Sequence, residues 1–266
     1  MGGDEKSADG KGPIGNPSGN PSPVDALLGA AVESLEAGLF AAAEESLRAV
    51  LKFAPGHTGA FHLLAVSAYR QGRTRDAIDL FTSAVDGATD DPMILVNYAA
   101  VLNVRGRFDD AEAACRQAID IDTELPDAYN NLGTALAGLG RLDEADAACR
   151  RCISINPGHL QAYVNLANVL RRQGQLDPAI QVYVQVARIA PQFALAWSHH
   201  GTALRERGKI KEALRACKYA VHLEPDYADG HNNLGTVLVA RGDIDDAVAA
   251  FEKALAPGFE PVSGED

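Results

Sequence analysis

The stretch from Pro126 to His159, PDAYNNLGTALAGLGRLDEADAACRRCISINPGH, contains one complete copy of a unit that recurs through the sequence. Within it, Tyr129, Leu132 and Leu136 fall on one face of a helix, because residues three or four apart lie on the same side of successive helical turns. Gly140 predicts the end of that helix, since glycine takes the left-handed conformation that helix C-termini often need. The first part of the unit is therefore predicted to be helical.

A second helix is predicted after the turn at Gly140. Ala145 and Cys149 repeat the helical spacing, and Pro157 ends the unit because proline cannot continue a helix. Small residues at Gly133 and Ala145 allow the two helices to approach closely. The sequence of the unit therefore predicts a helix–turn–helix hairpin.

Seven copies of this unit follow one another in register, starting at residues 24, 58, 92, 126, 160, 194 and 228. The turn glycine recurs every 34 residues, with alanine five places after each one. The glycines are Gly38, Gly72, Gly106, Gly140, Gly174, Gly208 and Gly242. A fixed period of this length is typical of repeat proteins, in which each unit buries its apolar face only against its neighbours. We therefore expect an all-α solenoid over residues 24–256.

Composition excludes several classes of function. The net charge is −12, which argues against a nucleic-acid partner because phosphate contacts need clustered Lys and Arg. Residues 1–23 are rich in Gly, Pro and Ser and predict a disordered leader without a signal peptide, and residues 257–266 predict a flexible tail. No apolar run is long enough to insert into a membrane. A cytoplasmic location is the default expectation.

The cysteines are interpreted as reduced core residues. Cys115, Cys149 and Cys217 occupy the same place in their units, where other units carry residues such as Leu47. The spacing of Cys149 and Cys152 alternatively suggests redox or metal chemistry, but no second Cys/His pair follows at zinc-site spacing. We therefore expect buried, unreactive thiols and no metal.

The repeated pattern resembles the tetratricopeptide repeat. The residues that carry the resemblance are the aromatic at Tyr129, the Leu132-Gly133 pair, Gly140, Ala145 and the closing Pro157. It extends over all seven units. The resemblance implies a right-handed superhelix whose first helices line a concave groove, and such grooves hold extended or helical segments of partner proteins. The expected partner is accordingly a protein or peptide.

Asparagines recur at the sixth place of the unit, which the resemblance puts in the groove. This asparagine ladder comprises Asn97, Asn131, Asn165 and Asn233, and His199 interrupts it. An amide offers both donors and an acceptor, so it can pair with a peptide main chain without reading its side chains. The alternative is that each asparagine bonds the neighbouring repeat.

The array resembles in particular the repeat arm of the protein O-linked N-acetylglucosamine transferases, where such a ladder grips peptide backbone. In that arm, nearby aspartates tune the preference among bound peptides. Asp127 and Asp229 stand at two of those aspartate places, and the other places carry other residues here. The catalytic module of that family would follow the repeats, and we expect no transferase activity from the residues up to Asp266. Recruiting substrates for a separate glycosyltransferase is one alternative function.

Positive charge in the predicted groove is local. Arg171 and Arg205 lie in the fifth and sixth units, with Asn168 one helical turn before Arg171. This patch either meets an acidic residue of a partner or forms a solvated helix end next to Glu206.

The two ends of the array differ from its middle. Leu28, Leu63 and Val66 replace polar groove residues in the first two units and predict an apolar end. At the other end, Val248, Phe251 and Leu255 lie on a last helix that the following residues are too few to cover. Self-assembly into a homo-oligomeric platform through this helix is a further alternative.

No catalytic constellation or cofactor motif is present in the sequence. His199, His200 and His231 suggest a metal cluster, but His200 and His231 occupy core places and only His199 is expected to face the groove. The sequence therefore predicts a non-catalytic scaffold that binds an extended protein segment.

Overall fold

A computed structural model describes residues 22–87 and 90–255, and every element in these two ranges is helical. The protein divides into two compact units, residues 1–87 and 88–266. Unit 1 contains α1 (Pro23–Glu36), α2 (Phe40–Phe53), α3 (Thr58–Arg70) and α4 (Thr74–Asp86). Unit 2 contains α5 (Pro92–Val104), α6 (Phe108–Ile121), α7 (Pro126–Gly138), α8 (Leu142–Ile155), α9 (Leu160–Arg172), α10 (Leu176–Ile189), α11 (Ala194–Glu206), α12 (Ile210–Leu223), α13 (Ala228–Arg241) and α14 (Ile244–Ala254).

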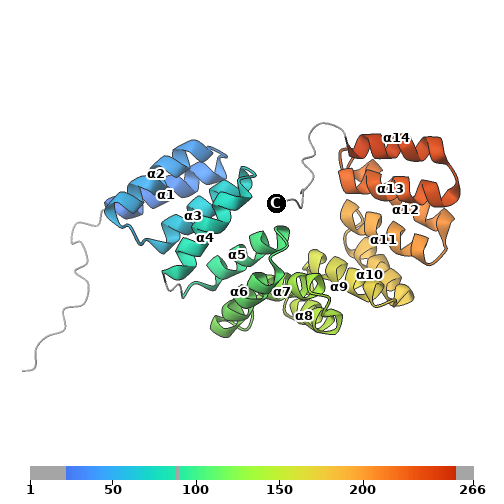
Figure 1. Cartoon of the computed structure of the whole chain (residues 1–266), viewed down its shortest axis with the longest axis horizontal. Helices are drawn as coiled ribbons and strands as arrows, with labels where there is room; N and C mark the ends of the chain where they lie inside the picture. The colour runs from blue at the N-terminus through green and yellow to red at the C-terminus, as the bar shows by residue number, and fades with distance from the viewer. Residues whose placement is uncertain (1–21, 88–89, 256–266) are drawn as a thin grey trace, which may run out of the picture. The chain divides into compact units, whose positions relative to one another are not determined.

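The helices form consecutive hairpins, α1/α2 to α13/α14, one for each predicted repeat (Figure 1). Six of the seven first helices begin at the predicted first residue, and α1 begins at Pro23, one residue earlier. The prediction of seven helix–turn–helix units is confirmed. The predicted leader up to residue 21 and the tail from residue 257 lie outside the described residues.

All seven turn glycines adopt positive φ angles, between 71° at Gly106 and 95° at Gly242. At Gly140, for example, the following Arg141 N–H bonds the carbonyl of Leu136, so the backbone reverses as the first helix ends. A residue with a Cβ is strained in this conformation. The strict recurrence of glycine at this place therefore follows from the turn geometry.

The α7/α8 and α11/α12 hairpins close through contacts between small residues. A Cβ built on Gly133 would lie 2.8 Å from the Cys149 sulfur, and one built on Gly201 would lie 2.2 Å from the Cys217 sulfur. Ala145 is fully buried in the same interface. The predicted close approach of Gly133 and Ala145 is confirmed.

The four cysteines are free and buried, as predicted. Burial raises the pKa of the thiols of Cys115, Cys149, Cys152 and Cys217 to about 12. The thiols are therefore protonated at neutral pH and behave as small core side chains.

Successive hairpins of unit 2 pack so that the first helices lie together. The pairs α5/α7, α7/α9, α9/α11 and α11/α13 pack backbone to backbone, whereas within the described residues no two second helices of unit 2 do so. An ion pair of Arg116 on α6 with Glu144 on α8, at 3.7 Å, is a longer-range contact between two second helices. The first helices therefore occupy the more tightly spaced side of the unit. We call the surface formed by α5, α7, α9, α11 and α13 the first-helix face.

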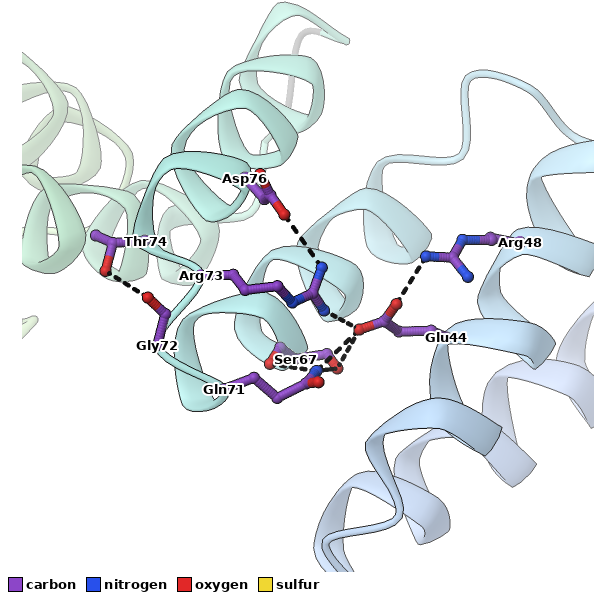
Figure 2. Close-up of polar contacts among 8 residues, drawn as sticks. All are labelled: Glu44, Arg48, Ser67, Gln71, Gly72, Arg73, Thr74 and Asp76. Atoms are coloured by element: carbon purple, nitrogen blue, oxygen red, sulfur yellow. Dashed lines mark hydrogen bonds and ion pairs between the residues drawn. The ribbon is translucent and has the colours of Figure 1, made fainter. Parts of the chain in front are cut away.

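A buried carboxylate links the two hairpins of unit 1. Glu44 on α2 accepts hydrogen bonds from Arg48, Ser67, Gln71 and Arg73 (Figure 2). Burial alone would raise the pKa of Glu44, but the Gln71 hydrogen bond and the charges of Arg73 and Arg48 lower it. The carboxylate therefore stays ionised and joins α2 to the next hairpin.

An equivalent ion pair recurs in unit 2. The Arg141 guanidinium lies 2.6 Å from the Glu112 carboxylate, and both residues occupy the same repeat places as Arg73 and Glu44. Later repeats carry Ile180 and Leu214 at the place of the glutamate, and both are buried. Ile78, in the second repeat, is also buried at this place, so ion-paired and apolar junctions alternate in the early repeats and the fifth and sixth are apolar.

No helix among the described residues is long and apolar enough to cross a membrane.

Candidate protein-binding groove

The ladder asparagines bond the preceding repeat. Asn131 Nδ2 donates to the Val96 carbonyl at 3.1 Å, and Asn233 Nδ2 donates to the Ser198 hydroxyl at 2.9 Å. Each acceptor belongs to the residue 35 positions earlier, on the preceding first helix. The bond to the neighbouring repeat, one of the two interpretations of the ladder, is therefore present.

These bonds leave part of each amide unused. Within the described residues, Oδ1 of Asn131 and Oδ1 of Asn233 accept no hydrogen bond, and neither atom is a buried unsatisfied group. The bond through Nδ2 fixes the orientation of each amide, and its Oδ1 stays accessible to another donor.

Asn165 is more fully engaged. Its Nδ2 donates to Asn130 Oδ1 at 2.9 Å and to the Thr134 hydroxyl at 3.2 Å, and its Oδ1 accepts from Gln161 Nε2 at 3.2 Å. Only one lone pair of Asn165 remains for a ligand. Asn97 lies half-buried on α5 and also takes part in interactions within the protein.

His199 continues the ladder with a ring instead of an amide. The ring stacks on Tyr183 at a centroid distance of 6.5 Å and an interplanar angle of 8°. Burial, helped by the positive charge of Arg171, lowers the pKa of His199, so the ring is neutral at pH 7. The Tyr183 hydroxyl in turn donates to Asn168 Oδ1 at 2.8 Å.

The arginines near the ladder are paired. Arg171 lies 2.7 Å from the Glu206 carboxylate, and Arg205 lies 3.7 Å from the same group. Glu206 therefore neutralises part of the predicted positive patch. Both predicted aspartates are exposed, and Asp127 lies 2.9 Å from the His159 ring.

The other two histidines pack within the protein. His231 Nε2 lies 2.7 Å from the Pro225 carbonyl, at the place where Trp197 Nε1 donates to Pro191. His200 packs between the rings of Tyr183 and Trp197. Within the described ranges, no group of three His, Cys, Asp or Glu side chains is arranged to hold a metal ion.

A pocket of about 330 Å³ opens on the first-helix face between α5, α7 and α9. Its apolar lining includes Phe108, Ala137 and Val169, and its polar lining includes Asn103 and Asn168. The Asn103 amide donates to the Asn131 carbonyl at 2.9 Å, while its Oδ1 is buried without a hydrogen-bond partner among the described residues.

Family models of the tetratricopeptide repeat (TPR) match the sequence over residues 62–126, 124–192 and 200–259. Together these matches cover more than half of the sequence. The chain is a TPR protein. TPR proteins generally mediate protein–protein interaction, and the fold is typically a non-catalytic scaffold.

Solved TPR structures have the same fold. A TPR protein from Parabacteroides merdae shares 19% identity, covering 90% of this chain and 94% of its own, with a TM-score of 0.78. PilF from Pseudomonas aeruginosa shares 20% identity, covering 78% and 95%, with a TM-score of 0.64. A thermophilic TPR protein from Thermus thermophilus shares 23% identity, covering 63% and 93%, with a TM-score of 0.59. No curated protein matches the sequence significantly.

The last described TPR helix presents an apolar stripe. Val248 is 50% exposed, whereas Leu214 and Ile180 at the same place of the two preceding repeats are 8% and 7% exposed. Leu255, on the same face, is 77% exposed, and Phe251 lines a pocket of about 350 Å³ beside it. In the earlier repeats of unit 2, the first helix of the following repeat packs against the second helix.

In unit 1, the apolar residues predicted for the groove pack partly inward. Leu28 and Leu63 contact the core around Leu47 and Val50, and Val66 is half-buried. Val32, one turn from Leu28, is exposed. This TPR unit therefore presents a mixed surface at these places.

Several residues of the first-helix face were missed by the sequence analysis. Asn130 and Ser198 stand at the fifth place of their units, directly before the ladder place, and Asn103 stands at the twelfth, which the tetratricopeptide resemblance also puts in the groove, so their polar side chains were a usable signal. Phe108 lies on a second helix, outside those places, and no comparable signal pointed to it.

Proposed function

We propose that the first-helix face of unit 2 binds an extended segment of a partner protein by hydrogen bonds to its main chain. The observation that carries the proposal is the state of Asn131 and Asn233. One N–H of each amide is used to fix its orientation, and its Oδ1 is left as an acceptor. A peptide N–H is the complementary donor, and every residue of a partner except proline supplies one.

The structural and the binding interpretations of the ladder are compatible. An amide held by the preceding repeat loses little additional freedom when it accepts a bond from a ligand, so preorganisation supports affinity. Each bond contributes only about 0.5–1.5 kcal/mol, so several in a row are needed. The fuller engagement of Asn165 makes Asn131 and Asn233 the expected principal contacts.

The test begins with selection of binders from a displayed library of random linear peptides. Dissociation constants of the selected peptides are then measured for the wild type and for the double variant Asn131→Ala/Asn233→Ala. Loss of two hydrogen bonds should weaken binding by about 5- to 150-fold. The matched control is Gln181→Ala/Gln185→Ala, which removes two exposed amides from α10 without touching the first-helix face.

Two further measurements separate binding from folding. Circular dichroism checks that the double variant is folded, because the same substitutions remove bonds between repeats. Peptides N-methylated at single main-chain positions should bind more weakly at the positions that face the asparagines. The proposal would be contradicted if the wild type and the Asn131→Ala/Asn233→Ala variant bound the peptides with equal affinity. It would also be contradicted if N-methylation of the peptide changed the affinity at no position.

A second function, self-association, is favoured by the apolar stripe on α14. Val248 and Leu255 are exposed there, although the same stripe is covered in earlier repeats. Antiparallel pairing with α14 of a second copy would place the first-turn Asp245 and Asp246 beside the last-turn Lys253. This charge complementarity makes a second copy of the protein the expected occupant.

Sedimentation over a range of concentrations tests this second function. The wild type should shift from monomer to dimer as the concentration rises. Val248→Lys should stay monomeric, while Ala249→Lys at the exposed neighbouring position should behave as the wild type. A wild type that is monomeric throughout the range would rule out self-association.

A further inference from the structure

The pocket on the first-helix face lies where Gly138 brings no side chain over the Phe108 ring. At the equivalent junction in unit 1, the Arg70 guanidinium lies 5.7 Å above the Phe40 ring and donates to the Leu35 carbonyl at 3.0 Å. Phe108 occupies the place of Phe40, but Gly138 occupies the place of Arg70. Because glycine has no side chain, nothing from position 138 covers the Phe108 ring.

Gly138 and Phe108 are in close contact. A Cβ at Gly138 would lie 2.5 Å from Cγ of the Phe108 ring, so only glycine allows this approach. The ring, Ala137 and the buried Val169 then form an apolar lining, and the pocket they line measures about 330 Å³. This volume lies in the range of sites that bury a small apolar group.

Polar groups beside this lining are set to pair with peptide backbone. Asn168 Oδ1 accepts from the buried Tyr183 hydroxyl, whose pKa is raised by burial so that it remains a donor. The Asn168 amide is thereby oriented, and its N–H groups have no acceptor among the described residues. On the α5 side, Asn103 Oδ1 is a buried acceptor without a donor.

We propose that this pocket takes one aromatic side chain of the peptide bound to the first-helix face. The proposal rests on the proposed function and adds the specificity that a main-chain ladder lacks. An aromatic ring matches the Phe108 ring and the apolar lining. The backbone carbonyl of the same aromatic residue is the group that the Asn168 N–H groups can bond. The Arg172 guanidinium already donates to the Ala137 carbonyl at 2.6 Å, so an acidic side chain is not the expected occupant.

The test is a double-mutant cycle between protein and peptide. Peptides selected on the wild type should carry Phe, Tyr or Trp at one constant position. Replacing that residue with alanine should weaken binding to the wild type by about 10- to 100-fold. Ala137→Leu fills the pocket and should weaken the aromatic peptide similarly, but should not change binding of the alanine peptide.

The control is Ala240→Leu, which adds the same volume at an exposed position of α13. Thermal melts establish that both variants are folded. The pocket proposal would be overturned if the selected peptides had no constant aromatic position. It would also be overturned if replacing the aromatic residue with alanine weakened binding equally to the wild type and to Ala137→Leu. If those peptides still bind more weakly to Asn131→Ala/Asn233→Ala than to the wild type, main-chain binding by the first-helix face is retained and only the aromatic pocket is rejected. A library that yields no binder overturns both.

Discussion

The same substitution, glycine to alanine, should change stability in opposite directions at two helical positions. At Gly201 on α11, a new Cβ would lie 2.2 Å from the Cys217 sulfur and 3.1 Å from the Ala213 carbonyl oxygen. Cys217 is fully buried. At Gly29 on α1, no atom lies within 4 Å of the position that the new methyl group would take.

The magnitudes follow from two opposing effects. Alanine favours a helix over glycine by about 0.5–1 kcal/mol, and this gain applies at both sites. Overpacking a tight interface costs about 1–3 kcal/mol, which applies only at Gly201, and the 2.2 Å contact places the cost in the upper half of that range. Gly201→Ala should therefore destabilise by about 1–2 kcal/mol, whereas Gly29→Ala should stabilise by about 0.5–1 kcal/mol.

The assay is denaturant unfolding followed by circular dichroism. Hydrogen exchange of the α11/α12 and α1/α2 amides adds the local stability, because repeat arrays do not always unfold as one unit. Cys217→Ala in the Gly201→Ala background should restore part of the loss by removing the sulfur. An unchanged or raised stability of Gly201→Ala, or a complete lack of coupling with Cys217→Ala, would refute the close packing of α11 on α12.

Three other perturbations of the core and one of a repeat junction have defined outcomes. Ala145→Leu should lower the free energy of unfolding by about 1–3 kcal/mol, because Ala145 is fully buried between two helices, and an unchanged melting temperature would refute the register. Burial raises the pKa of the Cys149 thiol to about 12, so alkylation at pH 8 should be much slower in the native protein than in urea; equal rates by mass spectrometry would count against this burial. The pKa of His199 is lowered from 6.5 by burial, so the unfolded state binds its proton at higher pH and stability should fall as the pH decreases below 6.5. Urea titrations of the wild type and His199→Asn at several pH values check this, and an identical pH dependence in both would contradict it. Glu44→Ala removes the acceptor of four hydrogen bonds and should cost about 1–3 kcal/mol, while the exposed neighbour Glu45→Ala should change little in the same titration.

The helices and turns were predictable because their determinants are local. Gly140 ends a helix through its own φ angle, so the sequence near the residue suffices. Pro157 is compatible with the end of α8 but is not required for it, because α6 ends at the equivalent residue with Thr123 at that place. The period then extends that local conclusion to every repeat. The buried cysteines were predictable for the same reason, because they share a place with Leu47 and other apolar residues.

The contacts between repeats could not be predicted from the same pattern. Asn131 bonds a backbone carbonyl, that of Val96, and no side-chain pattern indicates such an acceptor. The pairing of Arg171 with Glu206 depends on the rotation from one hairpin to the next. The ring contact of Phe108 with Gly138 joins positions 30 residues apart, and the residues at these two places vary from unit to unit, so no repeated pattern indicated it.

The seven positive-φ glycines also bear on how an array of this kind can change in length. Each glycine completes a turn with contacts from its own hairpin, so a duplicated stretch of 34 residues would carry an intact turn with it. A gene could therefore gain or lose one unit without a new connecting loop having to arise. The junction residues, ion-paired at Glu112 and apolar at Leu214, would then decide which neighbours a transposed unit can accept. Exchange between two units that both carry glutamate, or both carry an apolar residue, at this place should be tolerated better than exchange between the two kinds of unit.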